Sequence, residues 1–306
     1  MRRFILAFSI SFWSVVALAQ LPWQSGIGTP VTAASFTGVG DTHSAGMVRH
    51  YGSIAYSSAT RGQNMYNICD ANTGTPTCKN IATDASTGLV SSTQSVGSIG
   101  TCGSGANQCY IKIACDDVNS VCTLTNGTSA AWPRFIPNAI GSIPGIGCVA
   151  ASFLVLSGDN LNASAPVSIG ATVSTTTVTS GTLQGIADAN GLGALLYFSG
   201  DNPTKSSFYE GAELKGSLPS VNTFYSNIGT SDGAGNGTIA QNGTTTTGAI
   251  GTNTTSGSSP IHICKGNSGD GVSSLDGTVI EVFWNTTDIS SNIAALTTTM
   301  RANAGN

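Results

Sequence analysis

Eight cysteines between positions 69 and 264 constrain the fold more than any other feature of the sequence. An even number of cysteines in a secreted chain indicates disulfides, and three close pairs could each close a local loop. These pairs are Cys69 with Cys78, Cys102 with Cys109, and Cys115 with Cys122. Cys148 and Cys264 would then form a long-range bridge, although spacing alone does not fix the connectivity. The spacings are too long for zinc sites of the CxxC type, so we expect no metal.

The amino terminus has the parts of a secretory signal peptide. Arg2 and Arg3 precede an apolar run that ends in Ala17-Leu18-Ala19. We therefore expect residues 1–19 to be a signal peptide and the mature chain to be extracellular or periplasmic. A membrane anchor is the alternative, but the run is shorter than the ~20 residues of a transmembrane helix. We expect no membrane span in the mature chain.

Low charge and short alternating segments favour an all-β fold. Only 8% of the 306 residues are charged, against about 25% in an average globular domain. The formal net charge of −4 gives no attraction to nucleic acid, so we expect no nucleic-acid partner. Residues 20–46 are small and Gly-rich, which predicts an extended lead-in, and residues 47–306 then form one domain. Its short strands and Gly/Asn turns predict an antiparallel β-sandwich of the concanavalin A/laminin-G jelly-roll type.

The segment Ile261–Trp284 reads as two strands joined by a Gly/Ser/Asp loop. Polar and apolar residues alternate in its second strand, which predicts a half-buried strand with Glu281 on the solvent face. Ile293, Leu296 and Met300 then follow at helical spacing and predict a short C-terminal helix. We expect Ser290 or Ser291 to cap this helix.

Three stretches of the chain resemble one known family. They are RHYGSIAYSSATRG at residues 49–62, the Cys102-x6-Cys109 loop followed by YIKIAC, and the closing segment Ile261–Asn303. They resemble the catalytic domain of the fungal-type α-L-arabinofuranosidase B enzymes, glycoside hydrolase family 54. The resemblance implies a secreted, carbohydrate-active β-sandwich that binds a polysaccharide and needs no cofactor. No single motif of the family is intact.

The resemblance implies retaining hydrolysis, in which a nucleophilic Glu and an acid/base Asp lie ~5–5.5 Å apart. The nucleophile position falls nearest the sequence Ser-Gly-Asp-Asn at 199–202, where Asp201 would replace the Glu and Asn202 would contact substrate. A second match by letter, Phe208–Gly211, would instead make Asp201 the acid/base. The acid/base position falls in a Gly-rich loop, on Asp270 or, with the fewest gaps, on Asn267.

Asp116 and Asp117 stand where the family has Tyr-Asp-Gln-Ser-Gly, which implies a role in substrate binding. Calcium binding by this pair is an alternative, because hard cations prefer clustered oxygen ligands. Trp132 is a candidate to stack on a sugar ring, although a tryptophan in such a position is more often part of the core. We expect Glu210 to lie at a solvated edge.

Two functions remain open at this point. The first is hydrolysis of α-L-arabinofuranosyl side chains with Asp201 as nucleophile and Asp270 as acid/base. The second is a non-catalytic module of the same fold, which binds glycans or serves in surface interaction or structure. The altered motifs favour the second chemically, and the length of the resemblance favours the first.

Overall fold

The computed structural model describes residues 36–305 except 71–74, 150–151, 157–160, 164–165, 179–181, 190–193, 253–256 and 266–272. The described residues belong to one compact unit, Phe36–Asn306. The expected signal peptide at 1–19 and most of the expected lead-in lie outside them.

Two antiparallel layers form this unit, which confirms the predicted β-sandwich. The first layer runs through ten strands joined edge to edge. In spatial order they are β14 (Glu213–Lys215), β13 (Ser206–Glu210), β12 (Ala194–Phe198), β11 (Gln184–Ala189), β19 (Ile261–Ile263), β8 (Leu154–Leu156), β5 (Val121–Thr125), β4 (Cys109–Asp116), β2 (Asn64–Asp70) and β3 (Cys78–Ala82).

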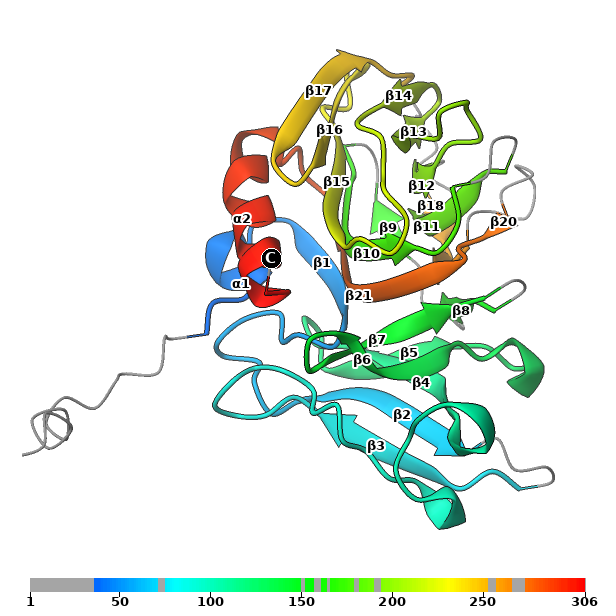
Figure 1. The fold of residues 1–306 in the computed structure, drawn as a ribbon. Helices are drawn as coiled ribbons and strands as arrows, with labels where there is room; N and C mark the ends of the chain where they lie inside the picture. Colours follow the sequence, from blue (N-terminus) through cyan, green and yellow to red (C-terminus); the bar gives the residue numbers. More distant parts are fainter. Residues whose placement is uncertain are drawn as a thin grey trace, which may run out of the picture. The chain divides into compact units, whose positions relative to one another are not determined.

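The second layer has β21 near its centre (Figure 1). Its strands in spatial order are β17 (Thr244–Ala249), β16 (Asn236–Gln241), β15 (Tyr225–Ser231), β10 (Ser168–Thr175) and β21 (Gly277–Asn285), followed by β1 (Met47–Gly52) and β7 (Ile143–Cys148) along the far edge of β21. Strand β6 (Arg134–Ile140) pairs with both β7 and β4 and so connects the two layers.

The remaining elements are short. Strand β20 (Ser273–Ser274) lies parallel to β11, and β9 (Leu161–Ala163) pairs with β18 (Gly257–Ser259). Single turns of 3₁₀ helix cover Gly97–Ile99, Gly105–Asn107, Ser129–Ala131 and Ser290–Asn292.

The hydrophobic core lies between the layers because each contributes alternate apolar side chains. Val282 and Trp284 of β21 belong to the same buried cluster as Leu196 and Phe198 of β12 and Phe208 of β13. Close packing requires glycine where strands approach bulky rings. A Cβ on Gly229 would lie 2.2 Å from the ring of Phe208.

Helix α2 (Ile293–Asn303) covers the outer face of the second layer. Figure 1 shows it against β15 and β16, beside the short helix α1 (Val39–Thr42). Ile293, Leu296 and Met300 are buried as predicted. The predicted cap was wrong: Ser290 belongs to the preceding 3₁₀ turn, and the helix begins after Asn292. Helix α1 lies within the segment for which we expected an extended lead-in.

Four disulfides are present, with the connectivity that sequence spacing suggested. Three of them close short local loops. The fourth joins Cys148 at the end of β7 to Cys264 directly after β19, across 116 residues of sequence. It therefore ties the second layer to the first.

Candidate functional site

Asp201 and Asn202 lie in the loop after β12. Asp201 accepts a hydrogen bond from the Ser199 hydroxyl at 2.9 Å, and its Oδ2 is 2.8 Å from Nζ of Lys215. Lys215 and Ser199 lower the pKa of Asp201, so this carboxylate is ionised at neutral pH. An ionised carboxylate can act as a nucleophile but cannot donate a proton. Asn202 is exposed.

Asp116 and Asp117 lie at the centre of a buried charged cluster. Asp117 Oδ1 is 2.7 Å from Nδ1 of His50, whose Nε2 is 3.5 Å from Oε2 of Glu281. Asp117 Oδ2 accepts the backbone N–H of Tyr56 at 2.5 Å. Asp116 accepts the backbone N–H groups of residues 50 and 118. Both carboxylates are at most 1% exposed, so in this arrangement they are covered by protein and are not accessible to a substrate.

His50 is held as a cation inside this cluster. Burial alone would lower its pKa, but the charge and hydrogen bond of Asp117, helped by Glu281, outweigh burial and raise it to about 10. Burial raises the pKa of Asp116, against the hydrogen bonds that it accepts. The cluster joins β1, β4 and β21, which indicates a role in holding the two layers together.

Two glutamates lie in places that the sequence did not predict. Glu281 is fully buried, where Thr172 donates to it at 3.0 Å, so the predicted solvent-facing position was wrong. The physical reason is that β21 is covered on both faces. Glu210 is only 1% exposed rather than at a solvated edge, and burial raises its pKa.

Asp270 and Asn267 lie outside the described residues, so their proposed roles stay predictions. The residues on either side of that loop are placed. Cys264 donates its backbone N–H to Ile186, and Ser273 donates to Leu183. Both ends of the segment that carries Asp270 are therefore anchored on or beside β11.

A row of directly opposed residues crosses one face of the first layer from β5 to β14. Opposed residues of an antiparallel ladder point to the same face, so these side chains share one surface. Because neighbouring strands are about 4.8 Å apart, seven strands extend over about 29 Å. We call this set the cross-strand row: Thr125, Val155, His262, Asp188, Leu195, Tyr209 and Glu213.

Asp188 and His262 form the polar centre of the cross-strand row. Nδ1 of His262 is 2.6 Å from Oδ1 of Asp188, and the backbone N–H of His262 donates to the same oxygen at 2.9 Å. Trp284 fixes the backbone of Asp188 by donating its indole N–H to the carbonyl oxygen at 3.0 Å. Asp188 is buried, whereas the His262 side chain is 12% exposed. The carboxylate therefore orients an imidazole whose other nitrogen is available to a ligand.

One end of the cross-strand row opens into a pocket of about 350 Å³. It is lined by Thr125, Asn126, Gly127, Phe153 and Val155. The Phe153 ring also packs edge-on against His262, with 6.0 Å between ring centroids. The pocket and the Asp188–His262 pair are therefore parts of one surface.

Trp132, the predicted stacking residue, contacts a lining residue of this pocket but is not itself part of the lining. Its indole N–H donates to the carbonyl oxygen of the lining residue Asn126 at 2.7 Å. Trp132 is 8% exposed, so most of its ring is covered. Its position supports the pocket wall more than it offers a stacking face.

A charged network lies at the opposite end of the row. The Tyr197 hydroxyl donates to Glu213 at 2.6 Å, and Lys215 bridges Glu213 at 3.2 Å to Asp201. Tyr197 and Lys215 occupy a second row, each opposite Ser207, on the same face. Burial and Glu213 raise the pKa of Tyr197. The predicted residue Asp201 thus belongs to the rim of the same face as Asp188 and His262.

Little in the sequence indicates Asp188 and His262 as a pair. They are 74 residues apart, and each is flanked by apolar residues of a buried strand. The available signal was the single polar residue in Ile-His-Ile and in Ile-Ala-Asp-Ala, which interrupts two otherwise apolar strands. Only strand register brings the two together.

Two classes of site find no support among the residues that the structure places. No group of three His, Cys, Asp or Glu side chains there could hold a metal ion. No helix in the described part of the chain is long and apolar enough to cross a membrane.

Comparison with solved structures identifies the fold. No family model and no curated protein sequence matches the chain. An arabinofuranosidase in complex with arabinofuranosyl-α-1,2-xylobiose superposes with a TM-score of 0.63 at 14% identity, over 88% of this chain and 65% of that one. A family 54 α-L-arabinofuranosidase soaked with a cyclic sulfate inhibitor gives 0.62 at 13% identity, over 88% and 66%. A mutant of such an enzyme, soaked with 4-nitrophenyl α-L-arabinofuranoside, gives 0.61 at 13% identity, also over 88% and 66%.

The chain spans just under two thirds of the length of these structures. At 13–14% identity the similarity establishes a shared sandwich fold. The chemistry must therefore be argued from the residues of this chain.

Proposed function

We propose that this protein is exported and binds the arabinofuranosyl-bearing side chains of a polysaccharide along the cross-strand row. The observation that carries the proposal is the Asp188–His262 pair, held at 2.6 Å in the middle of a partly open sheet face. Four disulfides support export, because such bonds persist in oxidising compartments. Residues 1–19 would serve as the signal peptide and residues 20–306 would form the exported chain.

The cross-strand row and the pocket at its end together have the composition that sugar binding requires. Ligand sites combine apolar and aromatic surface with a few fixed polar groups. Phe153 and Tyr209 supply aromatic surface, and Tyr209 is 38% exposed. His262 supplies a polar group whose direction Asp188 fixes. A linear or branched chain crossing the strands would meet each of these in turn.

The fold comparison supports the choice of sugar in this proposal. Two of the similar solved structures hold arabinofuranosyl-α-1,2-xylobiose or were soaked with 4-nitrophenyl α-L-arabinofuranoside. We therefore choose arabinofuranosyl-substituted xylo-oligosaccharides as the first ligand to test.

Binding is tested by calorimetric titration of the disulfide-bonded chain with arabinofuranosyl-α-1,2-xylobiose. His262→Gln should weaken binding about tenfold, the loss of one good hydrogen bond. The matched control is His43→Gln, because His43 lies at the end of α1, away from the row. Absence of heat with the wild-type chain and with longer arabinoxylan fragments would contradict the proposal.

Retaining hydrolysis of the same side chains is the second candidate. The favouring observation is Asp201, which Lys215 keeps ionised on the rim of the same face, as a nucleophile requires. Asp270 would serve as the acid/base, and its loop begins and ends beside β11. We propose these two roles on the strength of the resemblance to family 54.

The test of hydrolysis is release of 4-nitrophenol from its α-L-arabinofuranoside by the wild-type chain and by Asp201→Asn and Asp270→Asn. Loss of release in both variants would support the two roles. Binding without release would leave the protein as a glycan-binding module and would contradict the hydrolytic candidate.

A further inference from the structure

Two lysines, Lys265 and Lys112, contact aromatic rings that form or support the wall of the pocket at the β5–β8 end of the cross-strand row. Among the described residues, no carboxylate lies within ion-pair distance of Lys265 or Lys112. None of the described lining residues is acidic. The chain has only 11 lysines and arginines in total, so two lysines with no carboxylate partner among the described residues are a considerable local charge beside one pocket.

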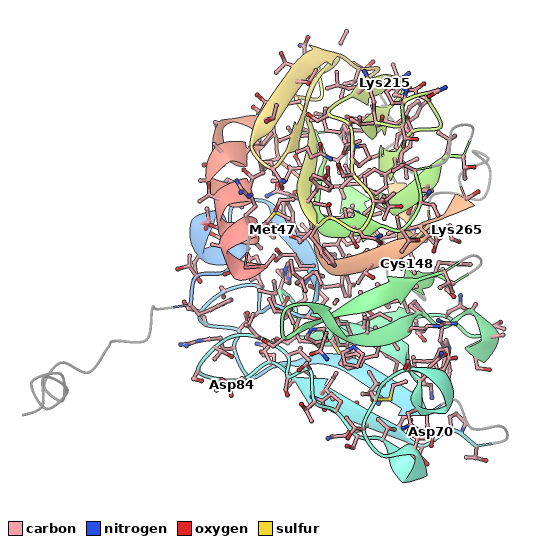
Figure 2. All side chains as sticks on the ribbon, in the orientation of Figure 1. Met47, Asp70, Asp84, Cys148, Lys215 and Lys265 are labelled. Atoms are coloured by element: carbon pink, nitrogen blue, oxygen red, sulfur yellow. A yellow bond between two sulfur atoms is a disulfide. The ribbon has the colours of Figure 1, made fainter. Side chains whose placement is uncertain are left out.

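Lys265 lies directly over one wall of the pocket. Its Nζ is 4.4 Å from the ring centroid of Phe153, within the range of a cation–π contact. Its neighbour Cys264 is bonded to Cys148 and hydrogen-bonded to β11, which fixes the start of the side chain. Figure 2 labels Cys148 and Lys265 on the same side of the unit. The aromatic ring holds the ammonium group in place without neutralising its charge.

Lys112 of β4 is connected to the same pocket through Trp132 and Thr125. Its Nζ is 5.9 Å from the ring centroid of Trp132, and the Trp132 indole is hydrogen-bonded to the lining residue Asn126. The backbone carbonyl of Lys112 accepts the hydroxyl of Thr125, another lining residue, at 2.6 Å. Each lysine is therefore attached to the pocket through a side chain that forms or supports its wall.

We propose that this pocket binds the carboxylate of a uronic acid residue, and that the polysaccharide recognised by the protein is an acidic one. The inference rests on the proposed function, because it assigns the ligand class at one end of the same row. The ring of the uronic acid would lie against Phe153, and Lys265 would donate to its carboxylate. Lys112 would add a second, longer-range attraction.

The overall charge limits the density of acidic groups on the ligand. The chain carries a formal net charge of −4, which repels a dense polyanion. A mostly neutral polysaccharide with occasional uronic acid residues avoids this repulsion and still meets the two lysines. Nucleic acids and heavily sulfated chains do not fit this balance.

The test compares two xylo-oligosaccharides that both carry arabinofuranose and differ at one group. One also bears a glucuronic acid residue, and in the other that carboxyl is reduced to the alcohol. We expect the acidic oligosaccharide to bind the wild-type chain about tenfold more tightly at low salt, a difference of 1.4 kcal/mol. The preference should shrink as salt increases, because partly exposed charges are screened.

Lys265→Gln should remove most of this preference and should change binding of the reduced oligosaccharide much less. Lys112→Gln should reduce the preference by a smaller factor, and Lys79→Gln on β3 serves as the control for net charge.

Equal affinity for both oligosaccharides, with no effect of Lys265→Gln, would overturn the inference and leave the proposed function intact. Failure of both oligosaccharides to bind would instead contradict the proposed function. Competition with free glucuronate tests whether the pocket binds any small carboxylate or only the uronic acid residue of a glycan.

Discussion

His262 and Asp188 face each other across neighbouring strands β19 and β11, with 2.6 Å between the imidazole Nδ1 and the carboxylate oxygen. Because the carboxylate accepts at Nδ1, that nitrogen carries the proton and Nε2 is left for a ligand. The pair therefore presents a fixed polar group at the middle of a sheet face that also contains an aromatic pocket.

Replacing Asp188 with Asn tests whether orientation of the imidazole matters. The amide group can place an N–H against Nδ1, which would favour the other tautomer. We expect Asp188→Asn to weaken arabinofuranosyl-xylobiose binding about tenfold, comparable with one lost hydrogen bond. Calorimetry gives the affinity, and nitrogen chemical shifts of the ring give the tautomer. Unchanged affinity in a variant whose tautomer has switched would contradict the role of this pair.

Burial of charged His50 predicts a decline in stability at alkaline pH. The pKa of an imidazole is ordinarily 6.5, and Asp117 and Glu281 raise that of His50 to about 10 in the folded protein. The stabilisation is therefore complete below pH 6.5, decreases between pH 6.5 and about 10, and is lost above that range. Within this window the free energy of unfolding should fall by about 1.4 kcal/mol per pH unit from this group alone. Denaturant unfolding at pH 7, 8 and 9, conditions chosen at roughly unit intervals, measures the slope.

The control for this prediction is His50→Gln, which removes the titrating group. We expect the variant to be less stable at neutral pH and to show a flatter dependence on pH up to about 9. His43→Gln should retain the wild-type slope. Identical slopes in the wild type and His50→Gln would show that another group is responsible.

The Cys148–Cys264 bridge should stabilise the fold more than a local bridge does. It spans 116 residues, whereas Cys102–Cys109 spans 7, and the loop entropy removed from the unfolded chain grows with span. Alanine replacement of both cysteines should therefore cost about 2 kcal/mol more for the long bridge than for the short one. The two pairs are matched in burial, since all four cysteines are at most 4% exposed. Equal losses in denaturant unfolding would contradict the entropic account.

Gly229 is required by the ring that packs on it. A methyl group there would lie 2.2 Å from Phe208, which is fully buried and cannot move outward. We expect Gly229→Ala to lower the free energy of unfolding by about 1–3 kcal/mol through overpacking. Gly103→Ala is the matched control, because its nearest contact would be at 3.9 Å. A fully stable Gly229→Ala variant would mean that β15 and β13 can separate locally without loss.

The sequence predicted those parts of the fold that depend on local pattern. The two strands expected within Ile261–Trp284 correspond to β19 and β21, and the helical spacing after residue 290 corresponds to α2. Short cysteine separations gave the local bridges because a seven- or nine-residue loop allows few alternatives.

The candidate site could not be predicted in the same way, because it depends on strand register. Alternation showed that Glu281 lies on the polar side of its strand, but it did not show that His50 would cover that side. Asp188 and His262 are brought together by pairing of strands far apart in sequence. The resemblance to family 54 pointed to Asp201, which lies at the rim of the same face, in the loop after β12, and is bound to Lys215 of β14.

The most direct test of the account is to map where a glycan contacts the sheet. Backbone amide shifts of the isotope-labelled, disulfide-bonded chain would be followed during titration with arabinofuranosyl-α-1,2-xylobiose. We expect the changes in amide chemical shift to be concentrated on the cross-strand row, around Val155, His262 and Leu195. Perturbations confined to the separate pocket of about 340 Å³ that contains Asp232 and Asp288, or to the region of β17, would contradict it.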